Sequence, residues 1–395
     1  MIRKNLNTII NAVIFIFIIT SIIAYPSETF NASLEGLNLW LNVVCPALLP
    51  FFICSEILVG LGVVSFIGSI FRPLMSIIFN IPGEGAFAFA MSIASGYPVG
   101  AKITATLRRN EQCTRVEAQR MLSLCSTSGP LFIIGAVSVG MLKKPEIAPL
   151  LLMSHYLSAI SCGFIMKFYK KNNKASNSIT IQNPFKELLK YKEKDGRSIG
   201  QLIGDSIKNG TSLILLVGGY IILFSVISRI IEVTGLSTYI TNAINMLPFI
   251  NVENKQNVSM IIAGILEVTN GVKACASQFL PDVLKLAIIS FFIGFGGLSI
   301  NAQVSAIIQD TDLSFLTYFT MKIVQGFLAS LYTLILYRIP IHQVFNFYMS
   351  YQDFPYKSWY SNITTSSLNL TGFLLILIIL SLTTFIFRCA KIIKK

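Results

Sequence analysis

Two lysines stand directly beside interruptions in otherwise apolar stretches of this 395-residue sequence. Lys102 ends the run SGYPVGAK (residues 95–102), and Lys273 ends the run EVTNGVK (residues 267–273). Lys102 and Lys273 are 171 residues apart, as are the glycines two positions before them, Gly100 and Gly271. Two ammonium groups at equivalent positions around one site would suit a dianion such as a dicarboxylate. The alternative is that each lysine ends its helix and extends its charge to the membrane interface.

A second pair of interruptions lies further along each half. The run STSGP (residues 126–130) breaks one long apolar stretch, and GFGGLSIN (residues 294–301) breaks another, with Ser128 and Gly297 169 residues apart. A nearly constant offset at two separate motifs indicates an internal duplication. Paired hydrophobic segments interrupted by Gly or Pro mark the binding site in transporters built from repeats.

Broken helices at membrane depth have a chemical use. Their free backbone groups need partners in protein or in a water-filled cavity, and the N-terminus of a half-helix attracts anions through its N–H groups and dipole. We therefore predict that the four breaks meet at one central cavity for a small anionic metabolite. The predicted substrate-binding residues are Ser95, Gly96, Tyr97, Gly100, Lys102, Ser126, Thr127, Ser128, Gly129, Thr269, Asn270, Gly271, Lys273, Gly297, Ser299, Asn301 and Gln303.

Several ionisable residues lie within apolar segments, where a charge is costly and by default suggests function. Glu56 and Glu267 could bind a coupling proton or Na⁺, or could each pair with a neighbouring lysine or helix end. His155 is better explained as a packed donor between helices. Arg72 and Lys322 complete this group.

The composition gives the class of protein that positions these residues. The chain is 53% apolar and only 12% charged, about half the charge of a typical soluble domain. Its uncharged runs reach or nearly reach the roughly 20 residues of a membrane-spanning helix. We therefore expect an all-α, polytopic membrane protein lying in the lipid bilayer, which excludes ordinary soluble enzymes and secreted disulfide scaffolds.

The net charge of +13 comes mainly from loops and ends. Basic residues concentrated there follow the positive-inside rule, which places both termini and the basic loop of residues 170–200 in the cytoplasm. The sequence contains no patch of interleaved basic and aromatic residues, so we expect no nucleic-acid binding. With no paired cysteines, two histidines and no nucleotide motif, the sequence predicts no metal, no cofactor and no ATP-driven chemistry. The sequence is also compatible with a homo-oligomer.

Hydropathy divides the chain into five parts. We expect an N-terminal transmembrane helix (1–27), a first repeat (28–169), the basic cytoplasmic loop (170–200), a second repeat (201–339), and an external polar segment followed by a C-terminal transmembrane helix (340–395). A charged amphipathic connector is expected at 108–120. The expected apolar segments after the first helix are 43–64, 66–80, 86–107, 121–141, 147–168, 211–231, 236–250, 258–272, 283–308, 315–336 and 370–387.

A catalytic alternative rests on Ser128 and His155. The run Thr127-Ser128-Gly129 loosely resembles an intramembrane serine protease, with His155 on the next helix. Catalysis would require the His155 ring within hydrogen-bond reach of the Ser128 hydroxyl. The duplication also places Gly297 where a second serine would be expected, so we predict that the chain is not an enzyme.

Three runs resemble a known family: CPALLPFF (residues 45–52), SGYPVGAK (95–102) and STSGPLFIIG (126–135). They resemble the YlbJ family of sporulation integral membrane proteins, and the similarity extends from about residue 36 to 340. The resemblance implies two nucleoside-recognition, or gate, domains, similar to parts of concentrative nucleoside transporters. In those transporters the substrate lies between re-entrant hairpins and broken helices of two inverted repeats.

The resemblance also implies a cargo and a membrane. Family members are implicated in moving dipicolinic acid, a flat dicarboxylate, out of the mother cell across the outer forespore membrane. We therefore expect a carrier for a small anion, most specifically dipicolinate. A nucleoside or nucleobase transporter and a non-transporting sporulation scaffold remain as alternatives.

Overall fold

The computed structural model describes residues 2–170, 183–245 and 255–338. All regular structure in these ranges is helical, which confirms the predicted all-α class. The expected external segment and last helix, at 340–395, lie outside the described residues, as does the part of the basic loop at 171–182.

The chain begins with a bent pair of helices. Helix α1 (Ile2–Ala24) is followed by α2 (Pro26–Leu39), and the axis turns by 105° between them. Pro26 takes the first position of α2, where its missing N–H costs no hydrogen bond. A π-helical turn, η1 (Trp40–Val44), then continues into α3 (Cys45–Gly60).

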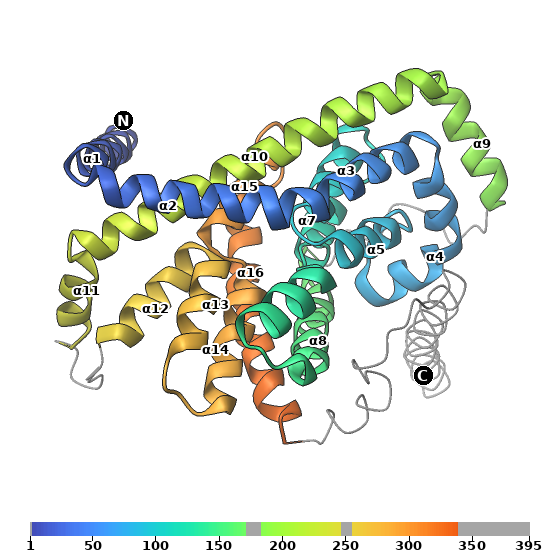
Figure 1. The fold of residues 1–395 in the computed structure, drawn as a ribbon. Coiled ribbons are helices and arrows are strands. Elements are labelled where there is room, and N and C mark those ends of the chain that lie inside the picture. The colour runs from blue at the N-terminus through green and yellow to red at the C-terminus, as the bar shows by residue number, and fades with distance from the viewer. Residues whose placement is uncertain (1, 171–182, 246–254, 339–395) are drawn as a thin grey trace, which may run out of the picture.

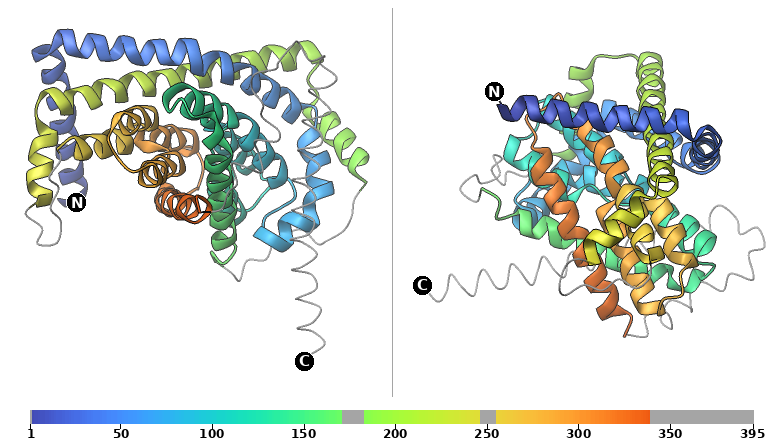
Figure 2. Two further views of the ribbon diagram at one scale, coloured as in Figure 1. Left: turned by 60° about the horizontal axis from the view of Figure 1, so that its bottom comes forward. Right: turned by 90° about the vertical axis from the view of Figure 1, so that its left-hand side faces the viewer.

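One long helix supports this N-terminal arm. Helix α10 (Ile199–Val233) crosses the width of the molecule, and α2 and α3 pack along it (Figure 1). Figure 2 shows α2 and α10 as neighbouring rods along one side, with most other helices beneath them. The Trp40 indole N–H donates to the Ile214 carbonyl at 3.0 Å, and its ring lies where a side chain on Gly218 would be.

The remaining elements of the first half carry two of the predicted breaks. Helix α4 (Val63–Phe79) precedes α5 (Gly85–Ser95) and α6 (Val99–Arg109), which are separated by the break at 96–98. Helix α7 (Arg115–Leu124) is separated by residues 125–130 from the π-helix η2 (Leu131–Met141). The short η3 (Pro145–Ile147) and α8 (Ala148–Met166) complete this half.

The second half carries the other two breaks. After α9 (Pro184–Asp195) and α10 come α11 (Leu236–Asn245) and α12 (Lys255–Leu266), and Glu267 separates α12 from α13 (Val268–Ser277). Gly296 separates α14 (Asp282–Phe295) from α15 (Gly297–Ile308), and α16 (Phe315–Leu336) follows.

Within the described ranges, four helical segments are long and apolar enough to cross a membrane, or five if the bent α1–α2 pair forms one span. They are Pro145–Met166, Ile199–Val233, Asp282–Ile308 and Phe315–Leu336. The third contains the break at Gly296. The chain is thus a multi-pass helical protein.

Three expected segments differ from the structure. The connector expected at 108–120 consists of the end of α6, a turn at 110–114 and the first part of α7, whose residues from Val116 onward are buried. Thr114 begins it with a capping box, because its hydroxyl accepts from the Glu117 N–H while the Glu117 carboxylate accepts in return. The basic loop of 170–200 contains α9, and the segment expected at 211–231 is part of the 35-residue α10.

The apolar core consists of two large clusters, and each takes residues from both halves. The first cluster gathers mainly first-half helices, but includes Val304, Ile307 and Ile308 of α15. The second cluster gathers mainly second-half helices, but includes Ile133 and Val137 of η2. The packing of the two broken helices is therefore reciprocal, as an internal duplication would require. The duplication itself stays a prediction.

Candidate functional site

The two breaks of the first half touch each other through glycines. Gly96 has φ +81°, and a Cβ there would lie 2.6 Å from the Gly129 nitrogen. Only glycine combines this backbone conformation with such close approach. The Ser92 hydroxyl lies 2.7 Å from the Thr127 hydroxyl and accepts from the Thr127 N–H. These contacts hold the hairpin tip of α5 and α6 against the extended segment before η2.

The two breaks of the second half meet in the same way. A Cβ on Gly297, which has φ +72°, would lie 3.1–3.2 Å from backbone atoms of residues 266–268. The buried Glu267 carboxylate accepts from the Asn270 N–H at 2.8 Å and caps α13. Glu267 is therefore the partner of a helix end, which is one of the two roles that the sequence left open for it. The positive end of α13 is thereby already occupied by this protein carboxylate.

All four breaks contribute to one cavity of about 110 Å³. This is smaller than the roughly 300–1,000 Å³ typical of sites for drug-sized ligands, which favours a compact solute. Helix α10 and η1 close the cavity through Val217, Ile221 and Val44. The predicted site residues that line it are Ser95, Gly96, Tyr97, Ser128, Gly129, Glu267, Thr269, Ser299 and Gln303.

Other predicted site residues lie in or next to the breaks without lining the cavity: Gly100, Ser126, Thr127, Asn270, Gly271, Gly297 and Asn301. Gly100 and Gly271 have packing roles, because a Cβ on either would collide with neighbouring backbone. The Asn301 amide donates to the Gly297 carbonyl at 2.6 Å, which ties the first turn of α15.

Two hydroxyls on the cavity wall have no hydrogen-bond partner among the described residues. They are Ser95 Oγ, at the end of α5, and Ser299 Oγ, in the first turn of α15. Ser95 is 4% exposed and Ser299 is 1% exposed. Buried polar atoms are nearly always satisfied, so a pair left unsatisfied on one cavity wall indicates a place for a ligand's acceptors.

The two lysines do not line this cavity. Lys102 forms an ion pair with Glu56 of α3, 3.0 Å between Nζ and Oε1. Glu56 is therefore paired with a lysine, which is one of the two roles that the sequence left open for it. Lys273 is 72% exposed and lies 4.0 Å from the carboxylate of Glu35 on α2. The structure thus does not bring the two ammonium groups to one site, and each instead faces the N-terminal arm.

His155 lies against Ser128, but through the backbone. Its Nε2 accepts from the Ser128 amide N–H at 2.8 Å, so this nitrogen's lone pair is occupied and cannot take a proton from the hydroxyl. His155 is packed between helices as expected, but its ring accepts a hydrogen bond there and does not act as the expected donor. This geometry does not form a protease dyad. Its ring also packs edge-on against Tyr97 and Tyr156.

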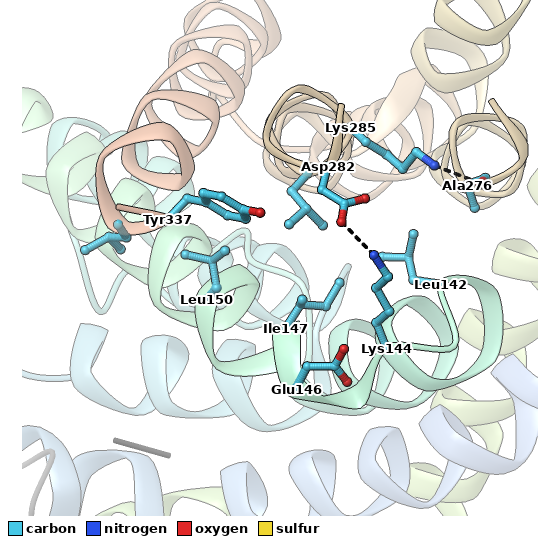
Figure 3. A pocket seen from close by; sticks show the side chains of 11 residues that line it. Leu142, Lys144, Glu146, Ile147, Leu150, Ala276, Asp282, Lys285 and Tyr337 are labelled. Atoms are coloured by element: carbon cyan, nitrogen blue, oxygen red, sulfur yellow. Dashed lines mark hydrogen bonds and ion pairs between the residues drawn. The ribbon is translucent and has the colours of Figure 1, made fainter. Parts of the chain in front are cut away.

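A second, larger cavity of about 320 Å³ lies at the far end of α16 (Figure 3). It lies between the η2–α8 turn, α13, α14 and the end of α16. On its wall Lys144 forms an ion pair with Asp282, 2.7 Å between Nζ and Oδ2. Both side chains are about half exposed. None of the predicted site residues lines it. We place the candidate site in the smaller cavity because two of its lining hydroxyls, those of Ser95 and Ser299, are buried and have no hydrogen-bond partner among the described residues.

The opposite end of α16 carries a polar clasp, which we define as Arg108, Arg109 and Gln119 with Asp310, Asp312 and Ser314. Arg108 contacts both carboxylate oxygens of Asp312 at 2.9 Å, and Arg109 reaches Asp310 at 2.7 Å. Gln119 exchanges two hydrogen bonds with the Ser314 backbone. Since α16 has 22 residues, the clasp and the larger cavity lie about 33 Å apart along it.

The clasp predicts a modest, pH-dependent stabilisation. Hydrogen bonding to Arg108 lowers the pKa of Asp312 below its usual value. Its contribution is therefore complete above a pH of about 3.9 and is lost as the pH falls through the lowered value. We expect Asp312→Ala to cost about 0.5–1 kcal/mol at pH 7, as for a partly exposed pair. Melting curves of the purified protein at pH 7 and pH 3 should show the gap closing, and a gap independent of pH would contradict the assignment.

The fold and cavity together define a multi-pass helical membrane protein whose helix breaks surround a buried polar site. Residues 41–173, which contain both first-half breaks, match the family model described as Gate, nucleoside recognition. The chain is 35% identical over 374 residues to the sporulation integral membrane protein YlbJ of Bacillus subtilis, covering 93% of this chain and 90% of that relative. The chain belongs to the YlbJ family.

A solved structure gives a weaker likeness. A variant of CNTnw in an outward-facing state aligns over 84% of both chains with 14% identity and a TM-score of 0.37. Similarity at this level does not establish a common fold.

Proposed function

We propose that this protein is a membrane transporter that moves a small organic anion through the central cavity. The observation that carries the proposal is the pair of buried, unsatisfied hydroxyls, Ser95 and Ser299, where four helix breaks meet. Ser299 also lies in the uncapped first turn of α15, where free N–H groups favour a negative charge. Family membership supports a role in sporulation, and the resemblance supports dipicolinate as the substrate.

The arrangement suits exchange between two sides of a bilayer. The clasp lies at one end of α16 and the larger cavity lies at its other end. Opening the clasp would expose the site to the clasp side, which the basic residues assign to the cytoplasm. Transport is passive or coupled to H⁺ or Na⁺, the membrane is the outer forespore membrane, and both termini face the cytoplasm.

The test is flux of labelled dipicolinate into proteoliposomes that contain the purified protein. We expect Ser95→Ala and Ser299→Ala each to raise the KM for dipicolinate roughly tenfold, because a hydrogen bond to a charged group contributes about 1.5–3 kcal/mol. The matched control is Ser212→Ala, an exposed serine of α10. Wild-type flux equal to that of empty liposomes would refute the transport proposal.

A nucleoside transporter is the second candidate, supported by the match of residues 41–173 to the nucleoside-recognition model. The small cavity argues against it, since a nucleoside carries a sugar as well as a base. Uptake of labelled uridine or adenosine that dipicolinate does not inhibit would establish it. Absence of flux for both solutes would favour the scaffold alternative.

A further inference from the structure

Lys322 is a fully buried lysine within the span of α16. Its side chain is 0% exposed, and it lies eight residues into the apolar helix. From the sequence it is only one of several ionisable residues in apolar segments. The signal that could have singled it out is the polar set at helical spacing on the same helix, Tyr318, Lys322 and Gln325.

The contacts of the Lys322 ammonium satisfy its hydrogen bonds. It donates to the Ser126 carbonyl at 2.9 Å and to Gln325 Oε1 at 2.7 Å. Its third side faces the Tyr97 ring, with Nζ 4.9 Å from the ring centroid. Two oxygens and an aromatic face form a complete shell for an ammonium group.

The charge of Lys322, unlike its hydrogen bonds, has no carboxylate partner. Among the described residues no acidic side chain forms an ion pair with it, and the acidic residues with ion pairs all join other cations. Burying an unpaired charge costs several kcal/mol. A group kept at that cost inside a membrane protein indicates a charge partner that arrives with a ligand.

Lys322 lies directly behind the wall of the central cavity. Tyr97, whose ring it contacts, lines the cavity, and Ser126 belongs to the same extended segment as the lining residues Ser128 and Gly129. Glu267 also lines the cavity, but its carboxylate caps α13 through the Asn270 N–H. Lys322 is thus a buried basic side chain next to the cavity, and no acidic side chain in the described part of the chain pairs with it.

We propose that Lys322 provides the positive charge that makes the central cavity selective for carboxylates. The ligand's carboxylate oxygens accept hydrogen bonds from Ser95 and Ser299, and its charge is balanced by the ammonium across the Tyr97 ring. The low dielectric of this site keeps the attraction strong through the intervening wall. Lys322 is therefore a specificity residue for the proposed transport, on which this inference rests, and it takes the role first assigned to Lys102 and Lys273.

The experiment compares an anion with a neutral molecule of the same shape. Binding of dipicolinate and of pyridine-2,6-dicarboxamide is measured by calorimetry on detergent-solubilised wild type, Lys322→Met and Lys322→Arg. We expect Lys322→Met to weaken dipicolinate at least tenfold while changing the dicarboxamide less than twofold, and Lys322→Arg to retain the preference for the anion. Lys170→Met is the matched control, since it removes an exposed lysine in the turn that follows α8.

The outcomes separate this inference from the proposed function. Dipicolinate bound equally well by wild type and Lys322→Met overturns the inference while transport stands. Equal weakening of both ligands also overturns it, because it assigns Lys322 a purely structural role. If Lys322→Met does not fold, the wild-type protein decides: a preference for the dicarboxamide over dipicolinate refutes a cationic site. Absence of dipicolinate flux in wild-type proteoliposomes refutes the function itself.

Discussion

Replacing Gly100 with alanine is expected to reduce folded, transport-competent protein to below a tenth of the wild-type amount. A Cβ at this position of α6 would lie 1.7 Å from the Cys125 carbonyl oxygen and 2.7 Å from the Ser92 Cβ. The oxygen is backbone, so no rotamer change can relieve the collision. Overpacking of this kind costs about 1–3 kcal/mol or more, and here it would also push the hairpin away from the segment that lines the cavity.

The matched control for Gly100→Ala is Gly219→Ala. Gly219 is exposed on α10, and a Cβ there would meet nothing within 4 Å. Alanine in a helix interior is favoured over glycine by roughly 0.5–1 kcal/mol, so this variant should be neutral or more stable. Yield by fluorescence-detected size exclusion and dipicolinate flux measure both variants. Equal behaviour of the two would show that α6 does not pack on the break as described.

Substituting Arg120 should cause the second large loss. This guanidinium is 1% exposed and donates to the Asn80 carbonyl at 2.7 Å and to the Tyr169 carbonyl at 2.6 Å. It thereby joins the middle of α7 to the C-cap of α4 and to the turn that follows α8. Each acceptor left without a donor costs about 1–3 kcal/mol, so we expect Arg120→Met to lower the free energy of unfolding by about 2–5 kcal/mol.

Two further variants test whether the effect is specific to Arg120. Arg115→Met removes an exposed arginine from the same helix and should change stability by less than about 0.5 kcal/mol. Arg120→Lys keeps the charge but lacks the planar fork that reaches both carbonyls, so its unfolding temperature should lie between those of wild type and Arg120→Met. Thermal unfolding in detergent at neutral pH measures all three, and an unfolding temperature of Arg120→Met equal to that of Arg115→Met would contradict the role.

The sequence was sufficient for the helical class and for the positions of the four breaks. Gly and Pro inside apolar runs carry that information locally, since the backbone must leave the helix where SGYP or STSGP occurs. The structure accordingly separates α5 from α6 and α7 from η2 at those runs.

The charges were harder to place from the sequence. Lys102 and Lys273 stand at matching positions, yet their orientation depends on Glu56 and Glu35, which lie far away along the chain. From the sequence, Arg120 belongs to a charged connector. The carbonyls that accept from it lie just after α4 and α8, and backbone acceptors cannot be recognised from residue type. Lys322 is placed by tertiary contacts with Ser126 and Tyr97, which lie 196 and 225 residues earlier in the chain.

The reciprocal packing of η2 and α15 has a consequence for how the protein is made. Residues 131–141 pack in a cluster whose other members include residues near 260–300, and residues 304–308 pack among helices synthesised first. Within its own half η2 packs mainly on α8 and η3, so we expect its apolar face to be completed when α13 and α14 are synthesised. We likewise expect the core of the first half to remain incomplete until α15 emerges from the ribosome.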